Sequence, residues 1–193
     1  MDRLSQARTL VIAALREPPP AAQLLAPLDY ILSEHFRQRS LCQAVENLAN
    51  ADGFDREMAE TVVAFMKSDF GLHVIDEEED LFPLLRRRAL PEDGIEDVLG
   101  ALSLEHASDH DDAERIVEGM AQLLETDGAG FPEPDFAKLL KCFAASERKH
   151  LIVENAIVMP FARARLTKDD LRNLGRRMAA RRGIDYPEKK NAV

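Results

Sequence analysis

The chain has 193 residues and a mass of 21.6 kDa, which is enough for one domain with a hydrophobic core. Apolar residues make up 46% of the sequence and helix-forming residues dominate, whereas Gly, Tyr and Trp are few, which argues against a β-sandwich or barrel. The apolar runs stop short of the roughly 18 residues that a membrane-spanning helix needs, and the N-terminal apolar stretch is too short for a secretory signal. Two cysteines a hundred residues apart, Cys42 and Cys142, form no disulfide framework. We therefore expect a helical, cytoplasmic protein.

The net charge of −10 argues against general nucleic-acid binding, but the charge is uneven along the chain. Residues 163–193 contain ten Lys or Arg and four Asp or Glu, so this stretch is basic and the rest of the chain is strongly acidic. The segment RRMAARR within it either contacts an anionic redox or protein partner or forms a solvated terminal helix. Both alternatives stay open at this point.

Proline and glycine residues divide the sequence into helical segments. A short N-terminal helix is expected before the PPP spacer at 18–20, and a last short helix between Thr167 and Gly183. Pro83 and Pro160 fall inside two longer helices, where a proline kinks or ends a helix. The four long helices are expected at about 21 or 27–50, 55–90, 95–124 and 135–164.

Four long helices joined by short loops predict an all-α fold, an up-down four-helix bundle with short flanking helices. The breaks between the helices divide the chain into three parts. These are an N-terminal helix and spacer (1–20), the bundle (21–165), and a basic C-terminal helix and tail (166–193).

Each long helix carries a stripe of residues spaced by three and four, the face that packs into a bundle core. Every stripe is apolar at its ends and polar in its middle, and all five histidines of the chain lie in these middles. In the third long helix the predicted stripe reads Leu99, Leu102, His106, His110, Ala113 and Val117. The five histidines are His35, His73, His106, His110 and His150.

Two of these histidines are followed four residues later by a glutamate, as His73 with Glu77 and His150 with Glu154. Residues spaced by four lie one turn apart on one face of a helix, so each pair can point at a common target. Ionised groups buried in an apolar core without partners would cost several kcal/mol each, on the order of a fold's whole stability. A metal centre removes that cost by coordinating them, so the sequence predicts a buried metal site.

The number of candidate ligands indicates two metal ions. Seven side chains are too many for one tetrahedral zinc ion, which takes three or four ligands. Two six-coordinate ions bridged by two glutamates and an oxo or hydroxo group would use all seven and leave one position open to a small molecule. Mixed imidazole and carboxylate ligands suit iron or manganese, and zinc fits by affinity alone.

Other polar residues near the histidines receive weaker assignments. Asp69, Glu147 and Gln38 lie on the stripes and either orient the imidazoles or sit at the exposed ends of the bundle. Cys42 is expected to fill the core. Residues expected on the outer, solvated faces are Glu78, Glu79, Asp109, Asp111 and Asp112.

With these residues in view, the chain resembles the hemerythrin-like family, also called the HHE cation-binding domain, over residues 28–161. The resemblance rests on His35 and on the segments HVIDEEEDLFP, EHASDH and HLIVENAIVMP. It implies a four-helix bundle with a non-haem di-iron centre, bridged by an oxo or hydroxo group. It further implies that His35, His73, His106, His110 and His150 are terminal ligands and that Glu77 and Glu154 bridge the ions.

One position departs from the oxygen-carrying hemerythrins, which have an aspartate five residues after the last histidine. Here Glu154 lies at four and Asn155 at five, as in bacterial HHE proteins that include ones linked to iron–sulfur cluster repair and nitric oxide stress. The resemblance implies a protein that binds O2 or NO at the metal centre for storage, scavenging or sensing. The alternatives are a di-iron redox enzyme acting on peroxide or NO, an iron-donating repair protein, and a structural or regulatory bundle.

Overall fold

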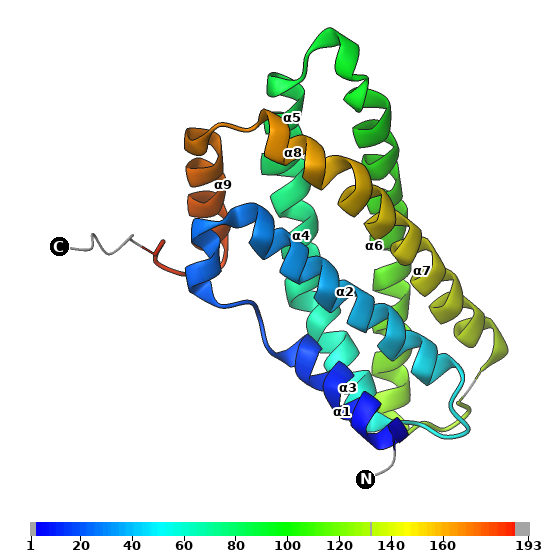
Figure 1. Cartoon of the computed structure of the whole chain (residues 1–193). Coiled ribbons are helices and arrows are strands. Elements are labelled where there is room, and N and C mark those ends of the chain that lie inside the picture. Colours follow the sequence, from blue (N-terminus) through cyan, green and yellow to red (C-terminus); the bar gives the residue numbers. More distant parts are fainter. Residues whose placement is uncertain (1–2, 132, 188–193) are drawn as a thin grey trace.

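The computed structural model describes residues 3–131 and 133–187, and the described residues contain helices and no strand. Four long helical rods form a bundle, which confirms the predicted fold class (Figure 1). The first rod is α2 (Pro27–Ala49) and the third is α6 (Ile95–Glu125). The second rod runs without a break through α3 (Arg56–Phe65), η2 (Met66–Phe70), α4 (Gly71–Ile75), η3 (Asp76–Leu81) and α5 (Phe82–Arg88). The fourth runs through α7 (Pro134–Val153), η5 (Glu154–Val158) and α8 (Met159–Arg165).

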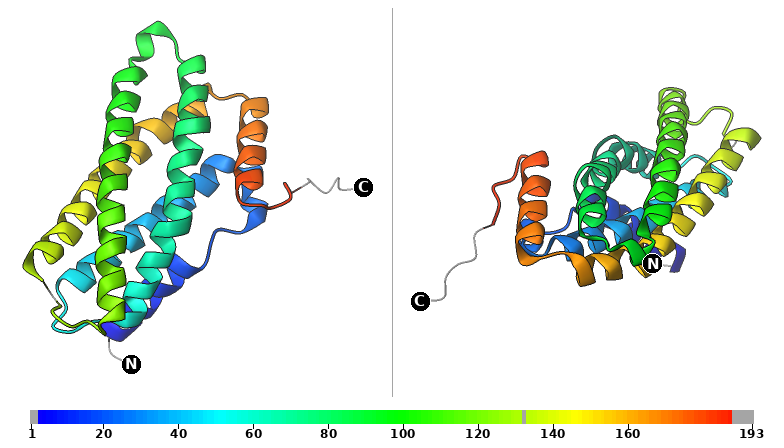
Figure 2. Two further views of the ribbon diagram at one scale, coloured as in Figure 1. Left: turned by 180° about the vertical axis from the view of Figure 1, so that it is seen from behind. Right: turned by 90° about the horizontal axis from the view of Figure 1, so that it is seen from above.

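Shorter elements flank the bundle: α1 (Arg3–Arg16), the 3-10 turns η1 (Ala21–Leu25) and η4 (Pro91–Asp93), and α9 (Lys168–Arg181). Figure 2 shows α9 standing beside the four rods. Side chains cap several helices, because the first backbone N–H groups of a helix have no partner within it. The Asp55 carboxylate accepts a hydrogen bond from the Met58 N–H at the start of α3, and Thr167 and Asp170 form a capping box at the start of α9.

The sequence left open whether the two prolines kink or end their helices. In the structure neither proline ends its helix, and each follows a wide π-helical turn. Pro83 is the second residue after η3, and Pro160 is the second residue after η5. A proline has no N–H to donate, and its ring clashes with the carbonyl four residues earlier. Those carbonyls, of Glu79 and Ala156, lie inside the wide turns, which make room for the rings while the rods continue.

The hydrophobic core is divided into two clusters by a polar section across the middle of the bundle. The lower cluster includes Leu41, Val62, Ile116 and Phe143, and packs residues from α1, α2, α3, η2, α6 and α7. The upper cluster packs residues from η1, α2, η3, α5, α6, η5, α8 and α9. The predicted stripes, apolar at their ends and polar in their middles, thus correspond to two apolar clusters with a polar section between them.

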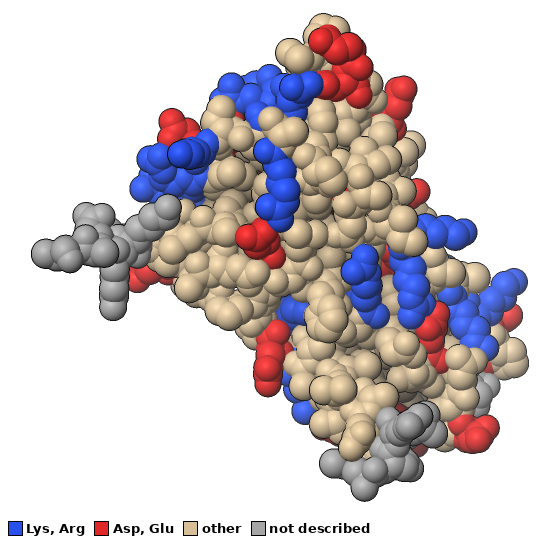
Figure 3. Space-filling view, viewed as in Figure 1, with Lys and Arg blue, Asp and Glu red and all other residues tan. Residues whose placement is uncertain are grey.

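The basic C-terminal helix α9 is attached to the bundle by buried side chains and by ion pairs. Leu174 and Met178 join the upper cluster. Arg182 lies 2.6 Å from the buried carboxylate of Asp76, and Arg181 lies 2.9 Å from Asp80. Figure 3 shows further Lys and Arg side chains gathered over α9 and the nearby ends of α5 and α8. Among the described helices, none combines the length and the apolar character needed to cross a bilayer.

Candidate metal centre

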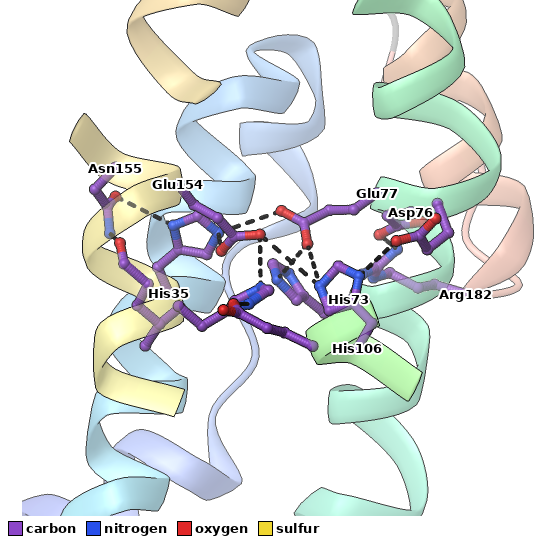
Figure 4. A network of polar contacts seen from close by, with 12 residues as sticks. His35, His73, Asp76, Glu77, His106, Glu154, Asn155 and Arg182 are labelled. Carbon is purple, nitrogen blue, oxygen red and sulfur yellow. Dashed lines mark hydrogen bonds and ion pairs between the residues drawn. The ribbon is translucent and has the colours of Figure 1, made fainter. Parts of the chain in front are cut away.

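Six of the seven predicted ligands meet in the polar section of the bundle. The six come from all four rods, and each is at least nine-tenths buried: His35, His73, Glu77, His106, His150 and Glu154. Figure 4 shows five of them labelled and converging between the helices. We refer to these six side chains as the His/Glu cluster.

The His/Glu cluster contains two overlapping groups of four potential metal ligands. One consists of His35 and His73 with both glutamates, and the other of His106 and His150 with the same two glutamates. Within each group the ligand atoms lie within 4.8 Å of one another. Because Glu77 and Glu154 belong to both groups, the arrangement fits two ions bridged by two carboxylates.

The histidines present their Nε2 atoms to the glutamates. His35 Nε2 lies 3.5 Å from Glu77 Oε1 and 3.3 Å from Glu154 Oε2. His73 Nε2 lies 3.3 Å from Glu77 Oε2, and His150 Nε2 lies 3.0 Å from Glu154 Oε1. Two ligand atoms that each lie about 2.0–2.2 Å from one ion are separated by distances of this size.

Several atoms of the His/Glu cluster have no hydrogen-bond partner among the described residues. They are His35 Nε2, His106 Nε2, Glu154 Oε2 and both carboxylate oxygens of Glu77. A buried polar atom without a partner destabilises a fold by about 1–3 kcal/mol. Metal coordination would satisfy these nitrogen and oxygen atoms together, and all are atom types that iron, manganese and zinc accept. The residues present therefore fit a metal ion pair.

Three of the four imidazoles are oriented by a hydrogen bond from the other ring nitrogen. His35 Nδ1 lies 3.1 Å from Asn155 Oδ1, and His150 Nδ1 lies 2.8 Å from Glu105 Oε2. These oxygens can only accept, so the Nδ1–H donates and leaves Nε2 free for a metal ion. The sequence did not single out Asn155 or Glu105 for this role. Their only signal was their position directly next to a ligand in the chain.

His106 has the third such partner, and here the sequence-based expectation was wrong. Glu78, which we expected on the solvated face, lies with Oε1 2.6 Å from His106 Nδ1. Its other oxygen accepts a hydrogen bond of 2.9 Å from Ser103 Oγ. The ring of Phe82 stacks on His106 with centroids 5.8 Å apart. The imidazole of His106 is therefore contacted on one face by Phe82 and at its edge by Glu78.

The glutamates also raise the affinity of the histidines for protons. Burial alone would lower the pKa of His73, but the charge of Glu77 outweighs it and raises the pKa to about 9. Burial acts on His150 in the same way, and its hydrogen bond to Glu154 raises the pKa to about 10. Burial would raise the pKa of Glu77, but the surrounding histidines hold it well below its usual range. Protons and metal ions therefore compete for the same Nε2 atoms.

His110, the seventh predicted ligand, does not join the His/Glu cluster. Its side chain is 70% exposed and lies 3.4 Å from Glu114 Oε1, on the surface of α6. The buried stripe of α6 continues from His106 to Asp109, Ala113, Ile116 and Met120, in place of the predicted His110 and Val117. A step of four turns the helix about 40° one way and a step of three about 60° the other. From His106 the step of three keeps the stripe on the core side of α6. Asp109, which we expected on the outer face, is therefore buried.

The remaining weaker assignments separate into two sets. Asp69 pairs with Arg37 at 3.1 Å, is partly exposed, and forms no hydrogen bond or ion pair with a histidine among the described residues. Gln38 and Glu147 are buried one turn away from ligands, and Cys42 is buried in the lower apolar cluster as expected. His110 and His106 line a surface hollow of about 460 Å³ together with Glu78 and Phe70.

The comparison with known proteins identifies one family. The family model described as the hemerythrin HHE cation-binding domain matches residues 26–162, which include all six members of the His/Glu cluster. No curated protein matches the chain.

Proposed function

The chain belongs to the hemerythrin HHE cation-binding family and is a metal-binding protein of hemerythrin type; from this premise we propose that it holds two iron ions and binds O2 or NO there. The proposed role is storage, scavenging or sensing of that small ligand. The observation that carries the proposal is the pair of ligand groups that share Glu77 and Glu154. Iron bound in this cluster would supply a redox-active centre with coordination positions open to a small molecule.

The ligand set supports iron as the metal. Imidazole and carboxylate ligands suit iron and manganese, and zinc binds by affinity alone. Because His110 lies at the surface, the chain supplies one ligand fewer than the sequence led us to expect. At least one further coordination position is therefore left to small molecules.

The chain's own residues hold this site dry and rigid. Glu77 and Glu154 are fully buried, and the two apolar clusters lie on either side of the His/Glu cluster. Such surroundings admit a diatomic molecule at little cost, whereas an anion enters only where groups of the site pair with its charge. The Nδ1 hydrogen bonds fix the imidazoles, so the ligands are arranged before the metal arrives.

The experiment is iron reconstitution without air, followed by optical spectra before oxygen, after oxygen and after its removal. We expect two iron ions per chain and a visible band that appears with oxygen and disappears when oxygen is withdrawn. The variant Glu77→Ala, which removes a shared ligand, should bind less than one ion per chain. A parent protein that takes up no iron, or a Glu77→Ala variant that still binds two ions, would contradict the proposal.

One observation favours a second candidate, a redox enzyme that reduces peroxide or NO. Such reductions consume protons, and Glu147 is a buried carboxyl one turn from His150. Burial raises the pKa of Glu147 to about 7, so this group can hold and release a proton near neutral pH. Continuous consumption of peroxide with an added electron donor would favour this candidate, whereas a stable ligand adduct would favour storage or sensing.

A contact between α9 and a redox or protein partner also remains a proposal. Arg181 and Arg182 pair with carboxylates of the bundle. Arg172 and Arg177 also pair with carboxylates, Asp169 and Asp80, but their side chains are more than half exposed, so they would be the cations most accessible to an acidic partner. Charge-reversal at these two positions would weaken binding to such a partner while the iron content stays unchanged.

A further inference from the structure

A second layer of buried polar side chains lies one helical turn below the His/Glu cluster. Gln38 follows His35 by three residues, Asp109 follows His106 by three, and Glu147 precedes His150 by three. The side chains come from α2, α6 and α7, and each residue is at most 3% exposed. We call these three residues the lower polar layer.

The offsets of three residues place Gln38, Asp109 and Glu147 on the same side of the His/Glu cluster. Later residues of α2 and α6 and earlier residues of α7 meet in the lower apolar cluster, for example Leu41, Ile116 and Phe143. The glutamates Glu77 and Glu154 lie on the other side, since they follow their histidines toward the upper cluster. The lower polar layer therefore faces the histidines from the side that the two carboxylate ligands leave open.

Each member of the lower polar layer has a polar atom without a hydrogen-bond partner among the described residues. These atoms are Gln38 Nε2, Asp109 Oδ2 and Glu147 Oε1. The second rod contributes no polar member to the layer, because at this level its Phe70 packs edge-to-face against Phe143 of α7 with centroids 5.9 Å apart. Unpaired buried polar groups destabilise a fold, so three of them at one level call for a ligand that pairs with them.

The electrostatic contacts show that Glu147 lies inside the bundle and not along its surface. Burial raises the pKa of Cys42 on α2, and the charge of Glu147 raises it further. Burial raises the pKa of Glu147, which also responds to the charges of His150 and Asp109. Burial raises the pKa of Asp109 too, against the opposing charge of His150. Both carboxyl groups of the layer therefore lie within electrostatic reach of the His/Glu cluster.

We infer that Gln38, Asp109 and Glu147 form a hydrogen-bonding site for the outer atoms of a small ligand whose inner atom is held at the His/Glu cluster. The ligand class is a short molecule of two or three oxygen or nitrogen atoms that accepts hydrogen bonds, such as peroxide or azide. Gln38 donates through its amide, and Asp109 and Glu147 donate through the O–H of their protonated forms, since an ionised carboxylate can only accept. The inference rests on the proposed function, because it assumes that a ligand binds at the metal centre.

The experiment is a titration of the iron-loaded, oxidised protein with azide, followed by absorption, with iron content measured on each sample. Gln38→Leu replaces the amide by an apolar side chain of similar size. Losing one hydrogen bond should weaken azide binding about five- to tenfold, with iron content unchanged. Glu147→Leu should weaken binding similarly, whereas Glu147→Gln, which keeps a donor in place, should restore most of it. The matched control is Cys42→Val, one turn further along α2, which should bind azide like the parent protein.

A second readout separates hydrogen bonding from a structural effect. The infrared stretching band of bound azide should shift in Gln38→Leu and stay in place in Cys42→Val. Azide affinity within twofold of the parent in both leucine variants, at full iron content, would overturn the inference while leaving the proposed function intact. Loss of iron from Gln38→Leu would assign this residue to metal loading and would also overturn it. Iron-loaded parent protein that binds no azide would contradict the proposed function itself.

Discussion

One of the contacts that attach α9 to the bundle is made by a buried carboxylate, Asp170, and its removal is a quantitative test of the fold. Asp170 accepts hydrogen bonds from Arg88 Nε and Arg87 Nη2, both at 2.8 Å, and from Thr167 Oγ1 at 2.7 Å. In Asp170→Ala the ion pairs are lost together with the half of the capping box that the Asp170 carboxylate supplies, whereas Thr167 Oγ1 still accepts from the backbone N–H of residue 170. Breaking a buried pair costs about 3–5 kcal/mol and losing a cap about 1 kcal/mol.

Arg87 and Arg88 are 61% and 39% exposed and can be hydrated once released, so the ion pairs contribute about 2 kcal/mol, below that range, and the lost capping hydrogen bond adds about 1 kcal/mol. We therefore expect a loss of about 3 kcal/mol in the free energy of unfolding, or about 6–12 °C in Tm for a chain of this length. The assay is denaturant and thermal unfolding followed by circular dichroism. The control is Asp169→Ala, whose side chain is 80% exposed and pairs only with Arg172 among the described contacts. It should change stability by less than about 0.5 kcal/mol.

The same variant should show a defined dependence on pH. The hydrogen bond from Arg88 holds the pKa of Asp170 well below its usual range. A carboxyl whose pKa is lower in the folded than in the unfolded chain stabilises the fold above the unfolded pKa of about 3.9. This stabilisation is lost as the pH falls through the folded pKa. The difference between parent and Asp170→Ala should thus be constant from pH 5 to 8 and shrink below pH 4. Equal stabilities of Asp170→Ala and Asp169→Ala at pH 7 would refute the reasoning.

Three further predictions concern the metal centre. His110→Ala should leave the iron content at two ions per chain, whereas His106→Ala should lower it to about one. The iron content is measured by metal analysis after gel filtration. Equal losses of iron in the two variants would count against the assignment of His110 to the surface. Metal-free protein should melt several °C below loaded protein, because metal binds only the folded chain, and equal Tm values would contradict this. Pro160→Ala should weaken iron binding about tenfold, as measured by competition with a chelator. The reason is that closing the π-helical turn rotates Glu154 away from the histidines. An unchanged affinity for iron would show that the turn does not depend on the proline.

Much of the site was predictable from the sequence because its residues break a pattern. Histidine and glutamate within an otherwise apolar stripe are costly unless something binds them, and spacings of four place them on one face. That reasoning named His35, His73, His106 and His150 together with both glutamates, and the structure brings these six side chains together. These residues could be named from the sequence because the buried stripe of a helix depends on spacing within that helix.

The prediction was wrong where the register of a helix had to be followed over several turns. Steps of three and of four are both compatible with a core stripe, and the choice after His106 depends on how α6 packs against its neighbours. The sequence offers a histidine at four and an aspartate at three, and chemistry favours the histidine. Packing instead buries Asp109 and exposes His110.

Contacts between helices were beyond local reasoning altogether. Glu105 on α6 reaches His150 on α7, and Glu78 on η3 reaches His106 on α6. Neither pairing follows from spacing within one helix, since it depends on the rotation of one rod against another. The π-helical turns are similar: a proline predicts a disturbance, and only the packed rod shows that the helix absorbs it by widening.

The division of the core into two apolar clusters has a consequence for how the protein opens. The lower cluster joins α1, α2, α3, η2, α6 and α7, and the upper cluster joins the other ends of the same rods with α9. Between them, the six members of the His/Glu cluster are polar, and without metal they are joined by ion pairs, ring contacts and a hydrogen bond and not by apolar packing. Each end can therefore exchange its amide hydrogens as a separate cooperative unit when no ion is bound. An ion pair coordinated from all four rods ties the two units together, and amides at both ends then exchange only when the whole bundle unfolds.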